Sequence, residues 1–201
     1  MSFLLSLSRL IDRLSEFVGR WLSWLVLAAV LISATNAIVR KGFDMSSNAF
    51  LEIQWYLFAT VFLLASGYTL MRQEHVRIDV VLHRFTRPTQ VKIEIFGIVV
   101  FLFPFVFAVI NLVLPLVLRA YQMHEMSSNA GGLIRWPVFA MVPVGFTLLG
   151  LQGVSELIKR VAFLKGLVDD PGKKKQQKTA EEELAEAILA QAQAKAQGAA
   201  K

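Results

Sequence analysis

The chain has 201 residues, of which 55% are hydrophobic and only 18% are charged, and it contains no cysteine. Soluble domains carry about 25% charged residues, so the composition argues against one, and the missing cysteines exclude disulfides, iron–sulfur clusters and thiolate zinc sites. The net charge of +6 could suggest nucleic acid, but the basic residues flank long apolar segments, where a membrane explains them. We therefore expect an all-α membrane protein that does not bind nucleic acid.

Residues 1–19 have the spacing of an amphipathic helix, with polar neighbours on the other side. The apolar face consists of Leu7, Leu10, Ile11, Leu14, Phe17 and Val18. Because Arg9, Asp12, Arg13 and Glu16 interrupt this segment, it lacks the apolar core of a signal peptide. We predict a helix that lies on the membrane surface and continues into the first span; a frayed N-terminus is the alternative.

Four long apolar segments follow, at about residues 21–39, 50–71, 93–118 and 136–158. A hydrocarbon layer of about 30 Å needs about 20 helical residues, so each segment is long enough to cross it. The third and longest contains Pro104 and Pro115 and is expected to be kinked or tilted. The sequence thus predicts a four-helix transmembrane domain over residues 20–165.

The orientation follows from the basic residues. They concentrate in the N-terminal segment, in the connection at residues 72–92 and after residue 158, whereas the other two connections hold only Arg40, Lys41, Arg119 and Arg135. The positive-inside rule therefore places both termini in the cytoplasm. The tail at residues 166–201 is basic and alanine-rich, and Thr179 with Glu182 fits a capping box for a solvated helix.

Polar residues inside the spans are few. We expect Glu52, Glu94 and Glu156 to lie near the interfaces, where a carboxylate still reaches water, and Asn111 and Gln152 to lie deeper and hydrogen-bond a neighbouring helix. No chain of titratable groups crosses the membrane, which argues against an ion pathway within this chain.

Histidines give no cofactor site, because His75, His83 and His124 all lie between spans and a haem bridging two helices needs histidines within them. His75 and Asp79 are four residues apart and could bind a metal, but a hydrogen-bonded pair in a loop is the more ordinary interpretation. We expect no enzyme activity and no cofactor.

Several short motifs share an order along the chain. They are Glu52-Ile53-Gln54-Trp55-Tyr56, Ala65-Ser66-Gly67-Tyr68-Thr69, His75-Val76-Arg77-Ile78-Asp79, Arg135-Trp136-Pro137 and Pro143-Val144-Gly145-Phe146. With the four spans, this pattern resembles the small membrane subunit of tripartite ATP-independent periplasmic (TRAP) transporters, the DctQ-like family, over about residues 20–165.

The resemblance implies a bacterial inner-membrane subunit that braces a large permease subunit during sodium-driven uptake of an organic acid delivered by a periplasmic binding protein. The sodium sites would lie on the large partner. Residues expected at partner interfaces are Glu52, Trp55 and Tyr56 on the second span, His75, Arg77 and Asp79 in the cytoplasmic loop, and Arg135, Trp136 and Pro137 at the start of the fourth span. Ordinary structural roles, as a lipid-facing belt or a solvated loop, are the alternative for each.

Two other functions compete with this interpretation. An independent four-helix multidrug-type exporter would need a carboxylate embedded in the membrane, and here Glu52 and Glu94 are predicted at opposite interfaces. A membrane anchor of an oxidoreductase is disfavoured by the absence of histidine in the spans.

Overall fold

A computed structural model of the chain describes residues 2–43, 47–73 and 85–169. Within these ranges the protein is helical, and its elements in chain order are α1 (Ser2–Phe43), α2 (Asn48–Arg72), α4 (Arg87–Gly97), the π-helical turn η1 (Ile98–Leu102), α5 (Phe103–Gln122) and α6 (Trp136–Leu164). Four helices are long and apolar enough to cross a membrane, counting Arg87–Gln122 as one. The prediction of an all-α protein with four spans is confirmed.

The helix ends follow from local sequence. The helix α2 stops at Gln73, whose left-handed conformation (φ 55°) lets its N–H bond the carbonyls of Thr69 and Leu70. Both α4 and α6 carry a proline, Pro88 and Pro137, in the first turn, where a missing N–H costs no hydrogen bond. The Arg135-Trp136-Pro137 motif therefore lies at the start of the fourth span, as expected.

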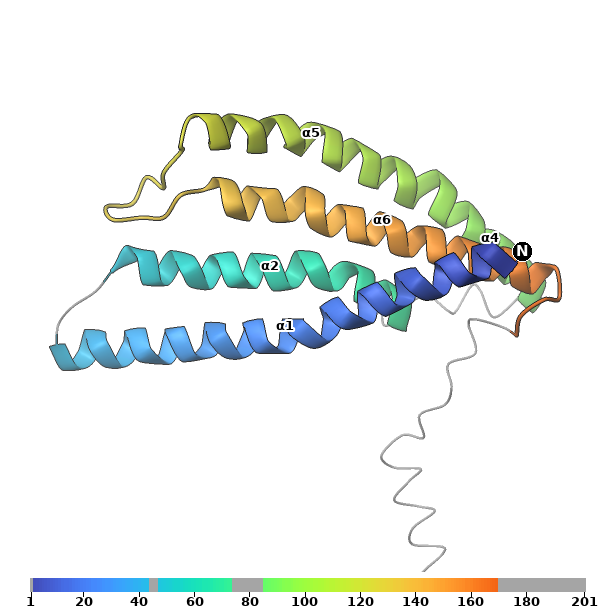
Figure 1. Cartoon of the computed structure of the whole chain (residues 1–201), viewed down its shortest axis with the longest axis horizontal. Coiled ribbons are helices and arrows are strands. Elements are labelled where there is room, and N and C mark those ends of the chain that lie inside the picture. The colour runs from blue at the N-terminus through green and yellow to red at the C-terminus, as the bar shows by residue number, and fades with distance from the viewer. Residues whose placement is uncertain (1, 44–46, 74–84, 170–201) are drawn as a thin grey trace, which may run out of the picture. The chain divides into compact units, whose positions relative to one another are not determined.

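The third span follows a curved course from α4 into α5 (Figure 1). The turn η1 lies directly before Pro104, and the N–H of Phe103 bonds the carbonyl of Ile98 in the wider π pattern. Such π turns interrupt long helices locally. Departure from α geometry in this span was expected from its prolines, but the π turn itself was not predicted.

The helix α6 holds the transmembrane unit together, since it contacts α1, α2, α4 and α5. Side by side, the long helices run in the order α5, α6, α2, α1 (Figure 1). Close packing depends on glycine: a Cβ on Gly145 would lie 2.7 Å from the carbonyl oxygen of Leu63 on α2, and one on Gly153 would lie 2.7 Å from Leu102. Small residues let helix backbones approach in this way in membranes.

Large apolar side chains point outward, and small or polar ones fill the helix interfaces. Phe62, Phe107 and Leu112 are 79%, 71% and 77% exposed, whereas Gln152 and Ser155 are fully buried. This distribution is the reverse of a soluble core, and it fits a protein whose outer surface is covered by lipid or by partner helices.

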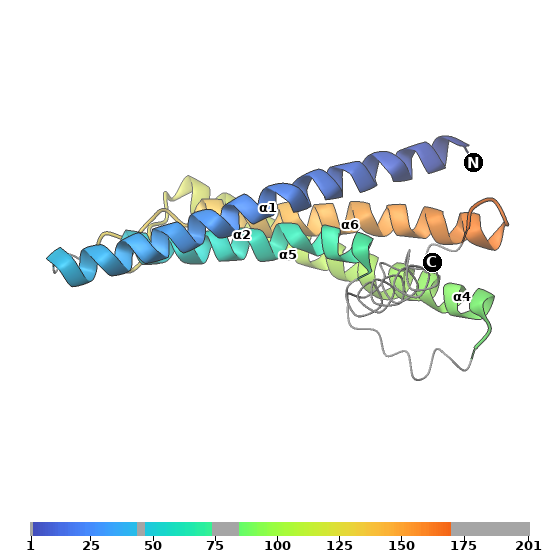
Figure 2. The ribbon, with the colours of Figure 1, turned by 90° about the horizontal axis from the view of Figure 1, so that it is seen from below.

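Residues 2–19 are helical, as predicted, and they form one uninterrupted helix with the first span. Figure 2 shows that the start of α1 lies at the same end of the unit as α4 and the last turns of α6. Ser8, Asp12 and Ser15, on the polar side of this segment, contact α6, a contact that was not predicted. Its position on the membrane surface stays a prediction.

Candidate functional site

The carboxylate of Glu52, in the second turn of α2, binds the segment at residues 123–135 that joins α5 to α6. Its Oε1 accepts hydrogen bonds from the Ser127 hydroxyl and from Asn129 Nδ2 at 2.8 Å. Its Oε2 accepts one from the backbone N–H of Leu133 at 2.6 Å. Three donors on one carboxylate make charge-assisted hydrogen bonds, which are stronger than neutral ones. We call Glu52 and these three donors the Glu52 cluster.

Two further side chains of α2 hold the same segment. Asn48 Nδ2 donates to the carbonyl of Ala130 at 2.9 Å, and the Tyr56 hydroxyl donates to the carbonyl of Ile134 at 3.2 Å. Since Asn48, Glu52 and Tyr56 are four residues apart, they line one face of the helix. That face fixes the connection between the last two spans over most of its length.

The segment also has structure of its own. Met126 and Ile134 form an antiparallel bridge, and the N–H of Ser127 donates to the carbonyl of Leu133 at 2.9 Å. The turn between them needs glycine: Gly131 has φ +71°, and a Cβ on Gly132 would lie 2.5 Å from that of Ser127 and 2.9 Å from the Glu52 carboxylate. The Gly131-Gly132 pair therefore both forms the turn and lets the carboxylate approach.

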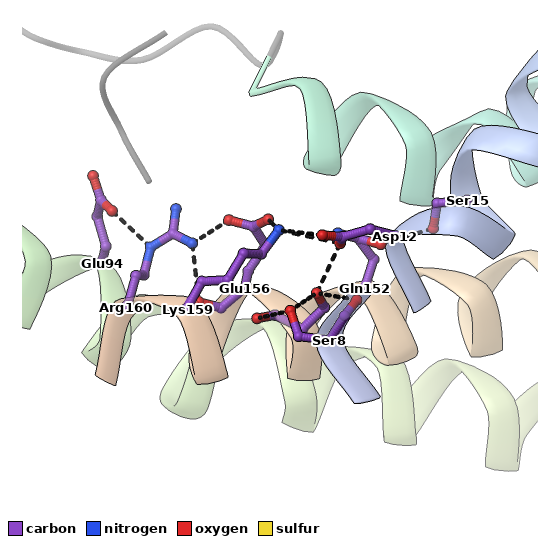
Figure 3. A network of polar contacts seen from close by, with 9 residues as sticks. Ser8, Asp12, Ser15, Glu94, Gln152, Glu156, Lys159 and Arg160 are labelled. Carbon is purple, nitrogen blue, oxygen red and sulfur yellow. Dashed lines mark hydrogen bonds and ion pairs between the residues drawn. The ribbon is translucent and has the colours of Figure 1, made fainter. Parts of the chain in front are cut away.

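A second polar cluster lies at the opposite end of the helices, between α1, α4 and α6. We call it the Asp12–Arg160 network, and its members are Ser8, Asp12, Ser15, Glu94, Gln152, Ser155, Glu156, Lys159 and Arg160 (Figure 3). The carboxylate of Asp12 accepts three hydrogen bonds from α6. The donors are Gln152 Nε2 at 2.9 Å, the Ser155 hydroxyl at 2.8 Å and Lys159 Nζ at 3.1 Å. One carboxylate of α1 thus binds three successive inward positions of α6.

Serines extend the contact between α1 and α6 on either side of Asp12. The hydroxyls of Ser8 and Ser155 lie 2.7 Å apart, and the Ser15 hydroxyl donates to Gln152 Oε1 at 2.7 Å. All four of these side chains are buried. The prediction that Gln152 bonds a neighbouring helix is confirmed.

The charged half of the network centres on Glu156 and Arg160, which are 1% and 3% exposed. Glu156 pairs with Arg160 and lies 2.5 Å from Lys159 Nζ, and Arg160 Nε donates to Glu94 on α4 at 2.7 Å. The expectation that Glu156 reaches water is wrong, because these partners enclose it. Buried charges are tolerated only when they are paired in this way.

Comparison with protein families gives one result. The family described as "Tripartite ATP-independent periplasmic transporters, DctQ component" matches residues 29–163, which is more than half of the chain. The chain belongs to the DctQ family. With four apolar helices, it is therefore a multi-pass inner-membrane protein and a component of a TRAP transporter. Comparisons with curated proteins and with solved structures give no match.

The two clusters relate differently to the DctQ match. The whole Glu52 cluster and the α6 and α4 parts of the network fall inside residues 29–163. Ser8, Asp12 and Ser15 lie before the matched region. The N-terminal half of α1 thus lies outside the residues that match the family, but it binds to α6, which lies almost wholly inside them.

The predicted site residues of α2 separate into two groups. Glu52 and Tyr56 bind the segment at residues 123–135 of the same chain, so their polar atoms have partners already. Trp55 is 73% exposed and points outward, which leaves it available to lipid or to another subunit. The role of all three at a partner interface stays a prediction.

At the start of α6, Arg135 pairs with Glu125 at 2.8 Å and lies over the ring of Phe139. The ring of Trp136 meets that of Tyr121 edge-on, with centroids 5.4 Å apart, and Pro137 lies in the first turn. His75, Arg77 and Asp79 lie outside the described residues. The structure therefore brings together Glu52, Tyr56 and the start of α6.

Several functional residues were missed from the sequence. Ser127 and Asn129 were not singled out, because nothing nearby in the chain signals their carboxylate partner. Asp12 was noted only as a charge that interrupts the apolar N-terminal segment. The i, i+4 spacing of Glu156 and Arg160 was the one available signal for the network.

Proposed function

We propose that this DctQ chain is the small subunit that braces the immobile part of a large permease subunit in sodium-driven, binding-protein-dependent uptake of an organic acid. Membership of the DctQ family supports a role in a tripartite transporter. The bracing role and the sodium and substrate classes come from the resemblance described above. In this proposal the sodium and substrate sites belong to the large subunit.

The observation that carries the bracing role is that the carboxylates of the spans are already occupied. Glu52 is bound by three donors, and Glu94 and Glu156 both bind Arg160, all within the chain. A subunit that carries ions through a membrane needs ionisable groups that exchange partners. Side chains committed to fixing one helix to another suit a rigid support instead.

The positive-inside rule assigns each of the two clusters to one side of the membrane in this proposal. Under the positive-inside rule, the Glu52 cluster faces the periplasm and the Asp12–Arg160 network faces the cytoplasm. The fixed segment at residues 123–135, with Arg135 beside it, then offers a preformed surface to the periplasmic binding protein. Of the three residues predicted on α2, Trp55 has an exposed ring, and in this proposal it contacts the large subunit.

The proposal is tested by purifying the chain from native membranes in mild detergent and identifying its companions by mass spectrometry. We expect a large multi-span permease subunit. Reconstituted vesicles should take up an organic acid only when both membrane subunits, the binding protein and an inward sodium gradient are present. Uptake by this chain alone, or visible absorption from a bound haem, would overturn the proposal in favour of an exporter or an oxidoreductase anchor.

A further inference from the structure

The amide of Asn111 on α5 has no neighbouring helix within the described part of the chain. Its Nδ2 donates to the carbonyl of Phe107 on its own helix at 2.8 Å, and the side chain is exposed. Its Oδ1 accepts no hydrogen bond from any described residue. The prediction that both deep amides bond a neighbouring helix thus holds for Gln152, whereas Asn111 bonds no other helix within the described part of the chain.

Asn111 lies near the middle of the membrane. The ring pair of Tyr121 and Trp136 marks one end of α5 and α6, and such rings gather at the membrane–water interface. Asn111 is ten residues from Tyr121, which corresponds to about 15 Å along a helix. Half of a hydrocarbon layer of about 30 Å is the same distance.

The backbone at the same position also lacks its usual donor. Pro115 has no N–H, so the residue that would ordinarily donate to the backbone carbonyl of Asn111, four positions earlier, cannot do so. Neighbouring helices and local changes of helix geometry both satisfy carbonyls freed by prolines within spans. The side-chain oxygen of Asn111 has no such local substitute, and lipid tails offer it no donor.

The face of α5 that carries Asn111 is turned away from the rest of the chain. On the opposite face, Val106 meets the position of Gly150 on α6, and Ala120 is buried. Phe107 precedes Asn111, and Leu114 and Leu118 follow it, all at helical spacing; the three are 71%, 46% and 51% exposed. The α5 face defined by Phe107, Asn111, Leu114 and Leu118 is thus apolar except for one amide.

We propose that this α5 face binds a transmembrane helix of the large permease subunit, which brings a hydrogen-bond donor to Asn111. The inference rests on the proposed function and locates its interface. A donor such as a Ser, Thr, Gln or Trp side chain fits, because the Oδ1 of Asn111 is an acceptor. The permease subunit is the occupant we choose because the chain is a component of a TRAP transporter. In a second copy of this chain the Asn111 amide still has one N–H to donate, so the crosslinks below must distinguish the two occupants.

The test places a photo-crosslinking amino acid at Phe107 and at Leu118 in the full chain, in native membranes. We expect both positions to crosslink to the large permease subunit. Crosslinks that join two copies of this chain, or none to any protein, would overturn the inference. If the permease subunit co-purifies but crosslinks only from other helices, the proposed function stands and the α5 interface is wrong; if it does not co-purify, both fail.

A substitution series supplies a second readout. Asn111→Leu should weaken association with the permease subunit roughly 3- to 20-fold, the range for one hydrogen bond between membrane helices. Leu112→Ala is the matched control, because Leu112 is 77% exposed but lies about 100° around the helix from Asn111; it should change association less than twofold. Equal effects of the two substitutions would show that Asn111 has no such partner.

Discussion

The carboxylate of Glu52 and the backbone N–H of Leu133 lie 2.6 Å apart, although 81 positions separate them in the chain. Ser127 and Asn129 bond the same carboxylate from the other side of the turn. Together with Asn48 and Tyr56, this side chain of α2 fixes the connection between α5 and α6. In the proposed orientation that connection faces the periplasm, so a change at Glu52 should alter the surface that is proposed to receive the binding protein.

Glu52→Ala should release the segment at residues 123–135. Without the carboxylate, the Leu133 N–H loses its acceptor, and its amide hydrogen should exchange on the order of tenfold faster. Hydrogen-exchange mass spectrometry of the purified complex measures this directly, and uptake should fall with it. Glu125→Ala, which breaks an exposed pair with Arg135, is the control and should leave Leu133 protected. Unchanged exchange in Glu52→Ala would contradict the assigned role.

Asp12→Ala should detach the N-terminal half of α1 from α6. The substitution leaves Gln152, Ser155 and Lys159 without their shared acceptor, which is expected to cost about 1–3 kcal/mol. Protease cleavage within residues 2–20 should accelerate in membranes. Glu16→Ala removes only an exposed pair with Arg20 and should change stability by less than about 0.5 kcal/mol. Similar cleavage of both variants would argue that α1 does not depend on Asp12.

Arg160→Met should be the most destabilising change in the network. It leaves Glu156 buried without its guanidinium partner, a loss of about 3–5 kcal/mol. Lys159 still pairs with Glu156 in that variant, but adding Glu156→Gln removes the buried charge that has lost its guanidinium partner, so the double variant should recover part of that loss. Denaturant unfolding in detergent of the wild type, the single variants and the double variant completes the cycle. Simple additivity of the two substitutions would mean that the pair is not coupled.

Gly145→Ala should force α2 and α6 apart. The new Cβ would lie 2.7 Å from the Leu63 carbonyl oxygen, and overpacking of this kind costs about 1–3 kcal/mol. Gly97→Ala adds the same methyl group where no atom lies within 4 Å, and alanine favours a helix by about 1 kcal/mol over glycine. The midpoint of thermal unfolding should therefore fall in the first variant and not in the second. A fall in neither would show that the helices can separate without cost.

The four spans and the start of α6 were predictable because their signals are local. Twenty apolar residues in a row require a membrane helix whatever surrounds them, and Pro137 marks a first turn by its own chemistry. The glycine turn at residues 131–132 is local in the same sense. Orientation across the membrane stays a prediction, and the capping box at Thr179 and Glu182 lies outside the described residues.

The clusters were not predictable, because each depends on which helices become neighbours. The spacing of Ser8, Asp12 and Ser15 indicates a polar helix face but does not say whether water or α6 covers it. Glu52 likewise reads as a carboxylate at a membrane surface until the connection at residues 123–135 folds over it. Asn111 and Gln152 were both expected to hydrogen-bond a neighbouring helix. Only the packing of the helices shows that Gln152 faces α1, whereas Asn111 faces away from the rest of the chain.

The unequal lengths of the helices affect how far each one reaches beyond the hydrocarbon layer. The helix α2 has 25 residues and the continuous helix Arg87–Gln122 has 36, which gives lengths of about 38 Å and 54 Å. The two lie on opposite sides of α6 (Figure 1). A hydrocarbon layer of about 30 Å is shorter than the longer helix, and the polar residues of α4, among them Arg87, Lys92 and Glu94, make up one end of that helix. The extra turns therefore reach into the headgroup layer and not into thicker hydrocarbon, and there Glu94 binds Arg160.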